Sequence, residues 1–203
     1  LKRILHKITG SDAGYKSPTD MGVNRAGFAI VDDEACRAAA IQEIIRRYLI
    51  AECSFKKGKI DESILERTKL LMEEVGATRY DRVVVKPAED YAEQKRQEDP
   101  ERFDNVVVSA IELPDGSIVT GRSSHTMDAS AAMVLNAIKK LAGIQDDALI
   151  ISPTILEALA NTKSGVFHDK SALNLEEIIM ALTLTKMTNP LAELALRELS
   201  NLK

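Results

Sequence analysis

Several residue types are scarce in this sequence, and each scarcity excludes a class of protein. Tryptophan is absent and aromatic residues make up 4% of the chain, which excludes a platform of aromatic rings that stacks single-stranded bases. Basic residues do not outnumber acidic ones, and the net charge of −4 argues against binding nucleic acid through its phosphates. No run approaches the roughly 18 apolar residues that a membrane-spanning helix needs. We therefore expect neither nucleic acid nor a membrane as a partner.

Cysteine is also scarce. Cys36 and Cys53 are the two cysteines, and no C-x-x-C pair predicts a zinc knuckle or a redox centre. Both fall in one predicted helix, where cysteine most often serves as a small core residue. This usage favours a reducing compartment, and we expect a cytoplasmic protein. The chain starts with "LKRILHKI", which is typical of an amphipathic helix and not of a signal peptide, so we expect it to be a piece of something longer.

Residues 1–82 are predicted to be mainly helical. Apolar residues recur at helical spacing over 41–49 and again over 64–75, and a glycine follows each pattern. Two long helices with a short connection favour an antiparallel pair. We assign residues 1–82 to a helical subdomain and residues 83–203 to an α/β subdomain.

The clearest pattern after residue 83 is a β-hairpin followed by a helix. β-branched residues over 106–113 and 117–121 predict two strands, and "PDG" between them predicts a tight turn. Asp128 is placed to cap the helix that follows. Apolar runs predict two further short strands, at 83–85 and 149–151.

The order of elements from 105 to 160 is similar to that of the cytidine-deaminase fold. We therefore expect an α/β (α+β) protein in which the second subdomain has three layers, α/β/α. Deaminases hold zinc with a His or Cys at one helix start and P-C-x-x-C at the next. The matching segments here read "MDASAA" and "SPTILEA", and Ser130 stands where the catalytic glutamate would be. Zinc needs about three or four nitrogen or sulfur ligands, so we expect the fold without zinc and no metal site.

Two helix starts, at Asp128 and Ser152, would lie side by side at one edge of such a sheet. Free N–H groups at helix starts favour an anion. The preceding loop adds hydrogen-bond donors, from Arg122, Ser123, Ser124 and His125. One interpretation is a phosphate or carboxylate pocket, and the other is a capped, solvated loop. The charge of Asp128 counts against the first.

The segment "YKSPTDMGVNRAGFAIVDDEA", residues 15–35, is a second candidate site. Lys16, Ser17 and Thr19 could contact a phosphate, while Asp20 and Asn24 could orient a sugar or a metal-bound water. It is not a Walker loop, because G-x-x-x-x-G-K is absent. The alternative is that its proline and glycines shape an irregular connection.

Several long strings resemble an uncharacterised bacterial family called domain of unknown function 1846. They are "YKSPTDMGVNRAGFAIVDDEA", "QEIIRRY", "AIELPDGSIVTG", "MDASAAMVLNAIKKLA" and "NPLAELAL". The resemblance extends over nearly the whole chain. It implies the C-terminal half of a longer cytoplasmic protein whose missing N-terminal half carries a phosphate-loop-like segment. It implies no established reaction.

We therefore expect a protein of unknown function that completes a nucleotide- or phosphorylated-metabolite-binding site with that missing half. In this hypothesis Lys16 and Arg122 neutralise the anion, and Asp20 and His125 are the acid–base candidates. The alternative is a non-catalytic structural or oligomerisation module, and a homo-oligomer is expected. Whether the protein is an enzyme, and which cofactor it uses, stays open.

Overall fold

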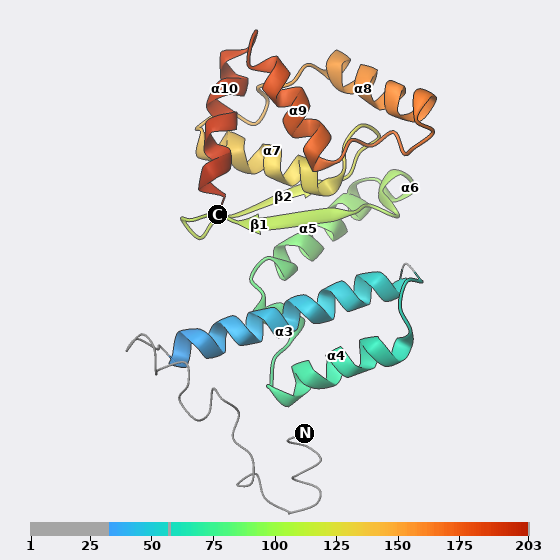
Figure 1. The fold of residues 1–203 in the computed structure, drawn as a ribbon, viewed down its shortest axis with the longest axis vertical. Coiled ribbons are helices and arrows are strands. Elements are labelled where there is room, and N and C mark those ends of the chain that lie inside the picture. Colours follow the sequence, from blue (N-terminus) through green and yellow to red (C-terminus); the bar gives the residue numbers. More distant parts are fainter. Residues whose placement is uncertain (1–32, 57, 203) are drawn as a thin grey trace, which may run out of the picture. The chain divides into compact units, whose positions relative to one another are not determined.

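The chain divides into two compact units, Leu1–Asp81 and Arg82–Lys203 (Figure 1). The computed structural model describes residues 33–56 and 58–202. The predicted helix at residues 1–8 and most of the candidate segment 15–35 lie outside the described residues.

The described part of the first unit is a pair of packed helices, as predicted. α3 (Asp33–Lys56) and α4 (Glu62–Glu74) lie against each other (Figure 1). Their contact is centred on Ile45, which is fully buried. Ile45 forms a cluster with Met72 and Ala77, which are also buried. A short 3₁₀ turn, η2 (Arg79–Asp81), is fastened to α3 by Gln42, whose amide donates to the Asp81 carbonyl at 2.9 Å.

Both cysteines are exposed, so the prediction that they are core residues is wrong. The core side of α3 is defined by Ile45. Cys36 lies about half a turn around the helix from it, at about 100° per residue. Within the described residues, α3 packs on α4 along the side that contains Ile45, and both cysteines lie outside that contact.

The second unit contains a β-hairpin. β1 (Val108–Glu112) and β2 (Ile118–Arg122) pair antiparallel, with Ala110 opposite Thr120. The predicted turn is present: Gly116 has φ +79°, and its N–H donates to the Leu113 carbonyl at 2.9 Å. Asp115 accepts hydrogen bonds from the hydroxyl and the N–H of Ser117, at 2.6 and 2.9 Å, and these bonds lower the pKa of its carboxyl.

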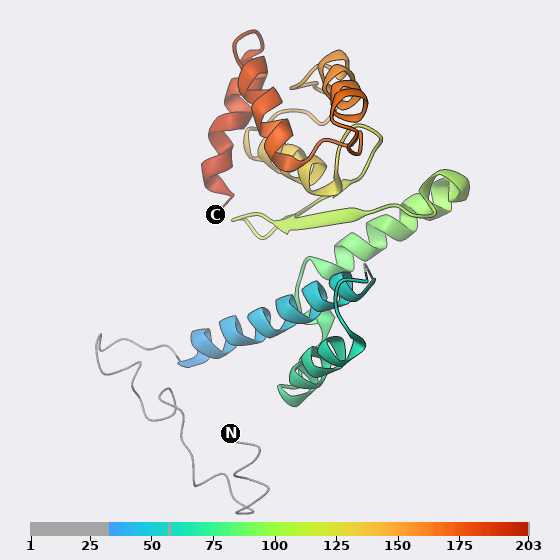
Figure 2. The ribbon, with the colours of Figure 1, turned by 45° about the vertical axis from the view of Figure 1, so that its right-hand side comes forward.

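Helices cover both faces of this hairpin (Figure 2). α5 (Val85–Glu98) lies on one face and α7 (Ala129–Leu141) on the other. Leu113, Val119 and Ala137 are buried between the strands and α7. The mixed helix-and-sheet class is therefore confirmed, on a sheet of two strands.

The two other predicted strands are not strands. Residues 83 and 84 form a turn in which Val84 already has helical backbone angles, and Val85 is the first residue of α5. Ile150 and Ile151 are buried, but the carbonyls of Leu149 and Ile150 accept hydrogen bonds from the Asn189 side chain, at 3.2 and 3.4 Å. The apolar run at 149–151 is thus buried without pairing to another strand. It does not add a strand to the sheet, so the deaminase-like fold is not supported.

Three more helices follow α7 in the chain, and the last two of them pack against α7. They are α8 (Pro153–Val166), α9 (Leu175–Thr185) and α10 (Pro190–Arg197), and the short η3 (Glu198–Asn201) follows. Their common core includes Ile138, Ile178 and Leu182, all fully buried, together with alanines that let the helices approach closely. None of the helices in the described part of the chain is both long enough and apolar enough to cross a membrane.

Candidate functional site

A cavity of about 430 Å³ lies where the end of β2 meets α6 (Pro100–Phe103). α6 starts at Asp99, whose side chain accepts from the Arg102 N–H at 3.1 Å, and Pro100 occupies its first turn. The cavity is lined from two segments, by Glu101, Arg102, Phe103, Asp104, Asn105 and Val106 and by Arg122, Ser123, Ser124 and His125. Four of the residues predicted from sequence therefore share one cavity.

Two arginines meet one aromatic ring in this cavity. The guanidinium carbon of Arg122 lies 4.9 Å from the centre of the Phe103 ring, and that of Arg102 lies 5.1 Å from it. Stacking on a ring restrains a guanidinium and leaves its N–H edges available. Among residues 33–56 and 58–202, neither arginine forms an ion pair with a carboxylate.

The positive charge of Arg122 nevertheless affects the pKa of one carboxylate on α5. The pKa of Glu98 is lowered, first by its hydrogen bond from Lys95, and the positive charge of Arg122 adds a smaller effect.

The loop that follows β2 supplies neutral polar groups. The Ser123 N–H donates to the Val107 carbonyl at 2.8 Å, and the Ser123 hydroxyl accepts from the Val107 N–H at 3.3 Å. The hydroxyl hydrogen of Ser123 is thus left to donate elsewhere. The His125 carbonyl accepts from the Ser171 hydroxyl at 3.1 Å, while its ring has no hydrogen bond within the described part of the chain.

Asp128 does not line this cavity. It precedes α7 without capping it through its side chain. Its N–H donates to the Leu173 carbonyl at 2.9 Å, beside a parallel bridge between Met127 and Leu173. The start of α7 therefore lies next to the start of α9, at Asn174.

The start of α8 has a different neighbour from the one we predicted. The hydrogen bonds from Asn189 to the carbonyls of Leu149 and Ile150 place it beside the start of α10. The helix starts at Asp128 and Ser152 thus each lie beside another helix start, and an anion site shared by these two stays a prediction.

A partly buried ion pair joins α8 to the start of α9. Lys163 on α8 has a side chain that is 12% exposed, and its ammonium donates to Glu177 at 2.8 Å and to the Ala172 carbonyl at 3.0 Å. Glu177 also accepts from the Asn174 N–H, while the Asn174 side chain accepts from the Glu177 N–H, which completes a capping box.

These contacts shift both pKa values of the pair. The hydrogen bond to Glu177 raises the pKa of Lys163, and the charges of Asp169 and Asp128 add to it. Burial by itself would raise the pKa of Glu177, but the bonds from Lys163 and the Asn174 N–H outweigh it, and the pKa is lowered.

Sequence reasoning missed the half of the cavity that comes from α6. The sequence pattern predicts a charged, largely solvated helix that starts at Pro87 and ends near Pro100, and it does not include α6. A signal was present: Asp99–Pro100 is the same cap-and-proline pattern as Asn189–Pro190, and it predicts a new helix start. That helix start is what places Arg102 and Phe103 beside β2.

The other predicted site residues lie outside the described residues: Lys16, Ser17, Thr19, Asp20 and Asn24. Their roles stay predictions. Within the described residues, no group of three or more His, Cys, Asp and Glu side chains is placed to hold a metal ion.

The structure defines a two-unit protein of mixed helix-and-sheet class whose second unit carries an arginine-lined cavity. The family model "Domain of unknown function DUF1846, C-terminal" matches residues 80–203, and "Domain of unknown function DUF1846, N-terminal" matches residues 1–76. The chain belongs to this family, as its sequence strings indicated.

Relatives with no stated activity share about half of the sequence. The chain is 51% identical over 205 residues to a UPF0371 protein of Clostridium botulinum (strain Alaska E43 / Type E3) and 49% identical to one of Clostridium tetani (strain Massachusetts / E88). Each match covers 100% of this chain and 40% of the relative. The chain thus spans less than half the length of the curated relatives it matches.

One expectation is corrected by these matches. We expected only the C-terminal half of a family member, with the N-terminal half missing. Residues 1–76 match the N-terminal family model, so sequence of both named domains is present in this chain.

Proposed function

We propose that the cavity between α6 and the end of β2 binds a phosphorylated metabolite. The observation that carries this proposal is the pair of guanidiniums, Arg102 and Arg122, which are held at the Phe103 ring without a carboxylate partner in the described part of the chain. Guanidinium forks match the oxygens of a phosphate, and such charge-assisted hydrogen bonds are about twice as strong as neutral ones.

The neighbouring groups suit the same ligand. Ser123, Ser124 and His125 line the cavity beside Arg122, and each can donate a hydrogen bond to an oxygen. His125 is also the acid–base candidate of this cavity, because its ring has no competing partner among the described residues. A reaction at the bound phosphate would need a proton carrier of this kind.

Ligand-induced stabilisation tests the proposal. Melting temperatures of the protein are measured with a panel of nucleotides and sugar phosphates. A ligand at about 100 times its Kd stabilises a protein by about 2.7 kcal/mol, which raises the melting temperature by several degrees. We expect Arg122→Ala to weaken binding about 10-fold or more, since it removes a charge-assisted hydrogen bond.

Arg197→Ala is the matched control. Arg197 is an exposed arginine on α10 that does not line the cavity and pairs with Glu193. It should leave the ligand shift unchanged. No shift with any phosphorylated compound would overturn the proposal. It would favour the alternative, a structural or oligomerisation module. The exposed apolar side chains of Met180, Leu184 and Met187 are consistent with that alternative.

A further inference from the structure

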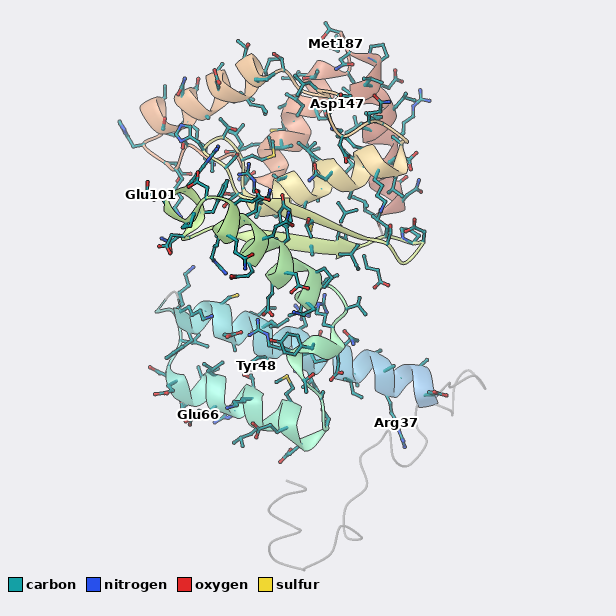
Figure 3. All side chains as sticks on the ribbon, turned by 180° about the vertical axis from the view of Figure 1, so that it is seen from behind. Arg37, Tyr48, Glu66, Glu101, Asp147 and Met187 are labelled. Atoms are coloured by element: carbon teal, nitrogen blue, oxygen red, sulfur yellow. The ribbon has the colours of Figure 1, made fainter. Side chains whose placement is uncertain are left out.

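The cavity contains two acidic side chains as well as two arginines. Glu101 and Asp104 line it together with Arg102 and Arg122, and Figure 3 shows Glu101 on α6. The formal charges of the lining carboxylates and guanidiniums cancel. A bare phosphate would therefore meet like charges beside the arginines, which opposes its binding. A ligand that fits the cavity therefore needs hydrogen-bond donors for the two carboxylates.

The carboxylates retain the capacity to accept hydrogen bonds. Asp104 accepts from the Asn105 side chain at 3.0 Å, and Glu101 has no hydrogen bond among the residues that the structure describes. An ionised carboxylate has about four acceptor positions, so both can accept from hydroxyl groups of a ligand.

The remaining lining groups also suit hydroxyls. Asn105, Ser123 and Ser124 are neutral and can each both donate and accept hydrogen bonds. Such groups match the hydroxyls of a sugar, which also donate and accept, better than they match an ammonium, which can only donate.

From this arrangement, and resting on the proposed phosphate site, we infer that the ligand is a phosphate ester of a sugar or similar polyol. Its phosphate contacts Arg102 and Arg122, while its hydroxyls donate to Glu101 and Asp104 and exchange hydrogen bonds with the neutral groups. The cavity of about 430 Å³ is of the size that small-molecule sites have.

Calorimetric titration of the chain with four probes tests this inference. The probes are inorganic phosphate, glucose 6-phosphate, unphosphorylated glucose and phosphoethanolamine, which combines a phosphate with an ammonium and no hydroxyls. We expect glucose 6-phosphate to bind at least about 10-fold more tightly than inorganic phosphate or phosphoethanolamine, and glucose to bind most weakly.

Variants separate the two halves of the site. The double variant Glu101→Gln with Asp104→Asn should bring glucose 6-phosphate to the affinity of inorganic phosphate without weakening inorganic phosphate itself. Arg122→Ala should weaken both. Glu157→Gln, at an exposed glutamate of α8 outside the cavity, should change neither.

The two proposals fail in different ways. If inorganic phosphate or phosphoethanolamine binds as tightly as glucose 6-phosphate, and does so through Arg122, the hydroxyl inference is wrong while the phosphate site stands. If no phosphorylated probe binds, both are wrong. Loss of binding in the double variant for inorganic phosphate as well would also overturn the inference, because it would show a general disruption of the cavity.

Discussion

At the scale of single residues, Gly121 shows how closely the hairpin and α7 approach each other. A Cβ atom added to Gly121 would lie 2.6 Å from the carbonyl carbon of Ala132, and it would overlap the backbone of Met133. Backbone atoms inside a helix cannot move aside as a flexible side chain can. The absence of a side chain at this position therefore lets α7 pack on β2, one residue before Arg122.

Replacing Gly121 with alanine should strongly destabilise the second unit. We expect a loss of about 3 kcal/mol or more in the free energy of unfolding, because α7 has to shift away from the strand. Chemical denaturation monitored by circular dichroism measures it. The matched control is Gly165→Ala in α8, where an added Cβ meets nothing within 4 Å. There we expect a gain of about 0.5–1 kcal/mol from helix propensity. Equal effects of the two substitutions would contradict this account.

At the scale of elements, one ion pair joins two helices and orders the segment before α7. Lys163 of α8 binds Glu177 of α9, and Glu177 in turn closes the capping box at Asn174. The segment before α9 pairs with the segment that contains Thr126 and Met127. The ion pair thus supports the loop that carries His125.

Replacing Lys163 with methionine should cost about 2 kcal/mol of stability at neutral pH, because it leaves the partly buried Glu177 without its cation. The pKa of Glu177 is lowered in the folded state, so its contribution is present above its ordinary value of 4.5 and is lost as the pH falls through the lowered value. The raised pKa of Lys163 keeps the contribution present up to its ordinary value of 10.5, and it is lost as the pH rises further.

The difference between wild type and Lys163→Met, measured by urea denaturation, should therefore be constant from about pH 5 to pH 9 and shrink in acid. Arg197→Met is the control, because Arg197 and Glu193 form an exposed pair with side chains 69% and 51% exposed. Its cost should stay below about 0.5 kcal/mol. A pH-independent difference that persists at pH 3 would show that Lys163 acts through packing and not through charge.

At the scale of the whole molecule, each unit has a buried cluster of its own. Ile45, Met72 and Ala77 form the cluster of the first unit, and a separate cluster around Ile138 and Leu182 lies in the second. Among the residues that the structure describes, the first cluster has fewer buried side chains than the second. We therefore expect the first unit to be the less stable of the two.

Ile45→Ala and Ile138→Ala should act on different unfolding transitions. Both side chains are fully buried, and truncation of such an isoleucine costs about 2–5 kcal/mol. Scanning calorimetry should show Ile45→Ala lowering an early transition and Ile138→Ala lowering a later one. A single transition that both substitutions lower equally would show that the two units unfold together.

Local patterns in the sequence correctly predicted much of this molecule. The helical pair in the first unit and the hairpin with its Pro114–Gly116 turn follow from patterns of neighbouring residues. Four residues that line the cavity, Arg122 to His125, are neighbours at the end of β2 and directly after it, and that they bind a ligand stays a prediction. Sequence strings also indicated the family.

Tertiary structure decided the rest, because it depends on residues that are distant along the chain. Whether the apolar run at 149–151 became a strand depended on the partner of its carbonyls, and the side chain of Asn189 took that place. The helix start that lies beside Asp128 is that of α9, from a distant part of the sequence. Which groups face Arg122 depended on α6, which brings Phe103 and the two carboxylates to the cavity from another segment of the chain.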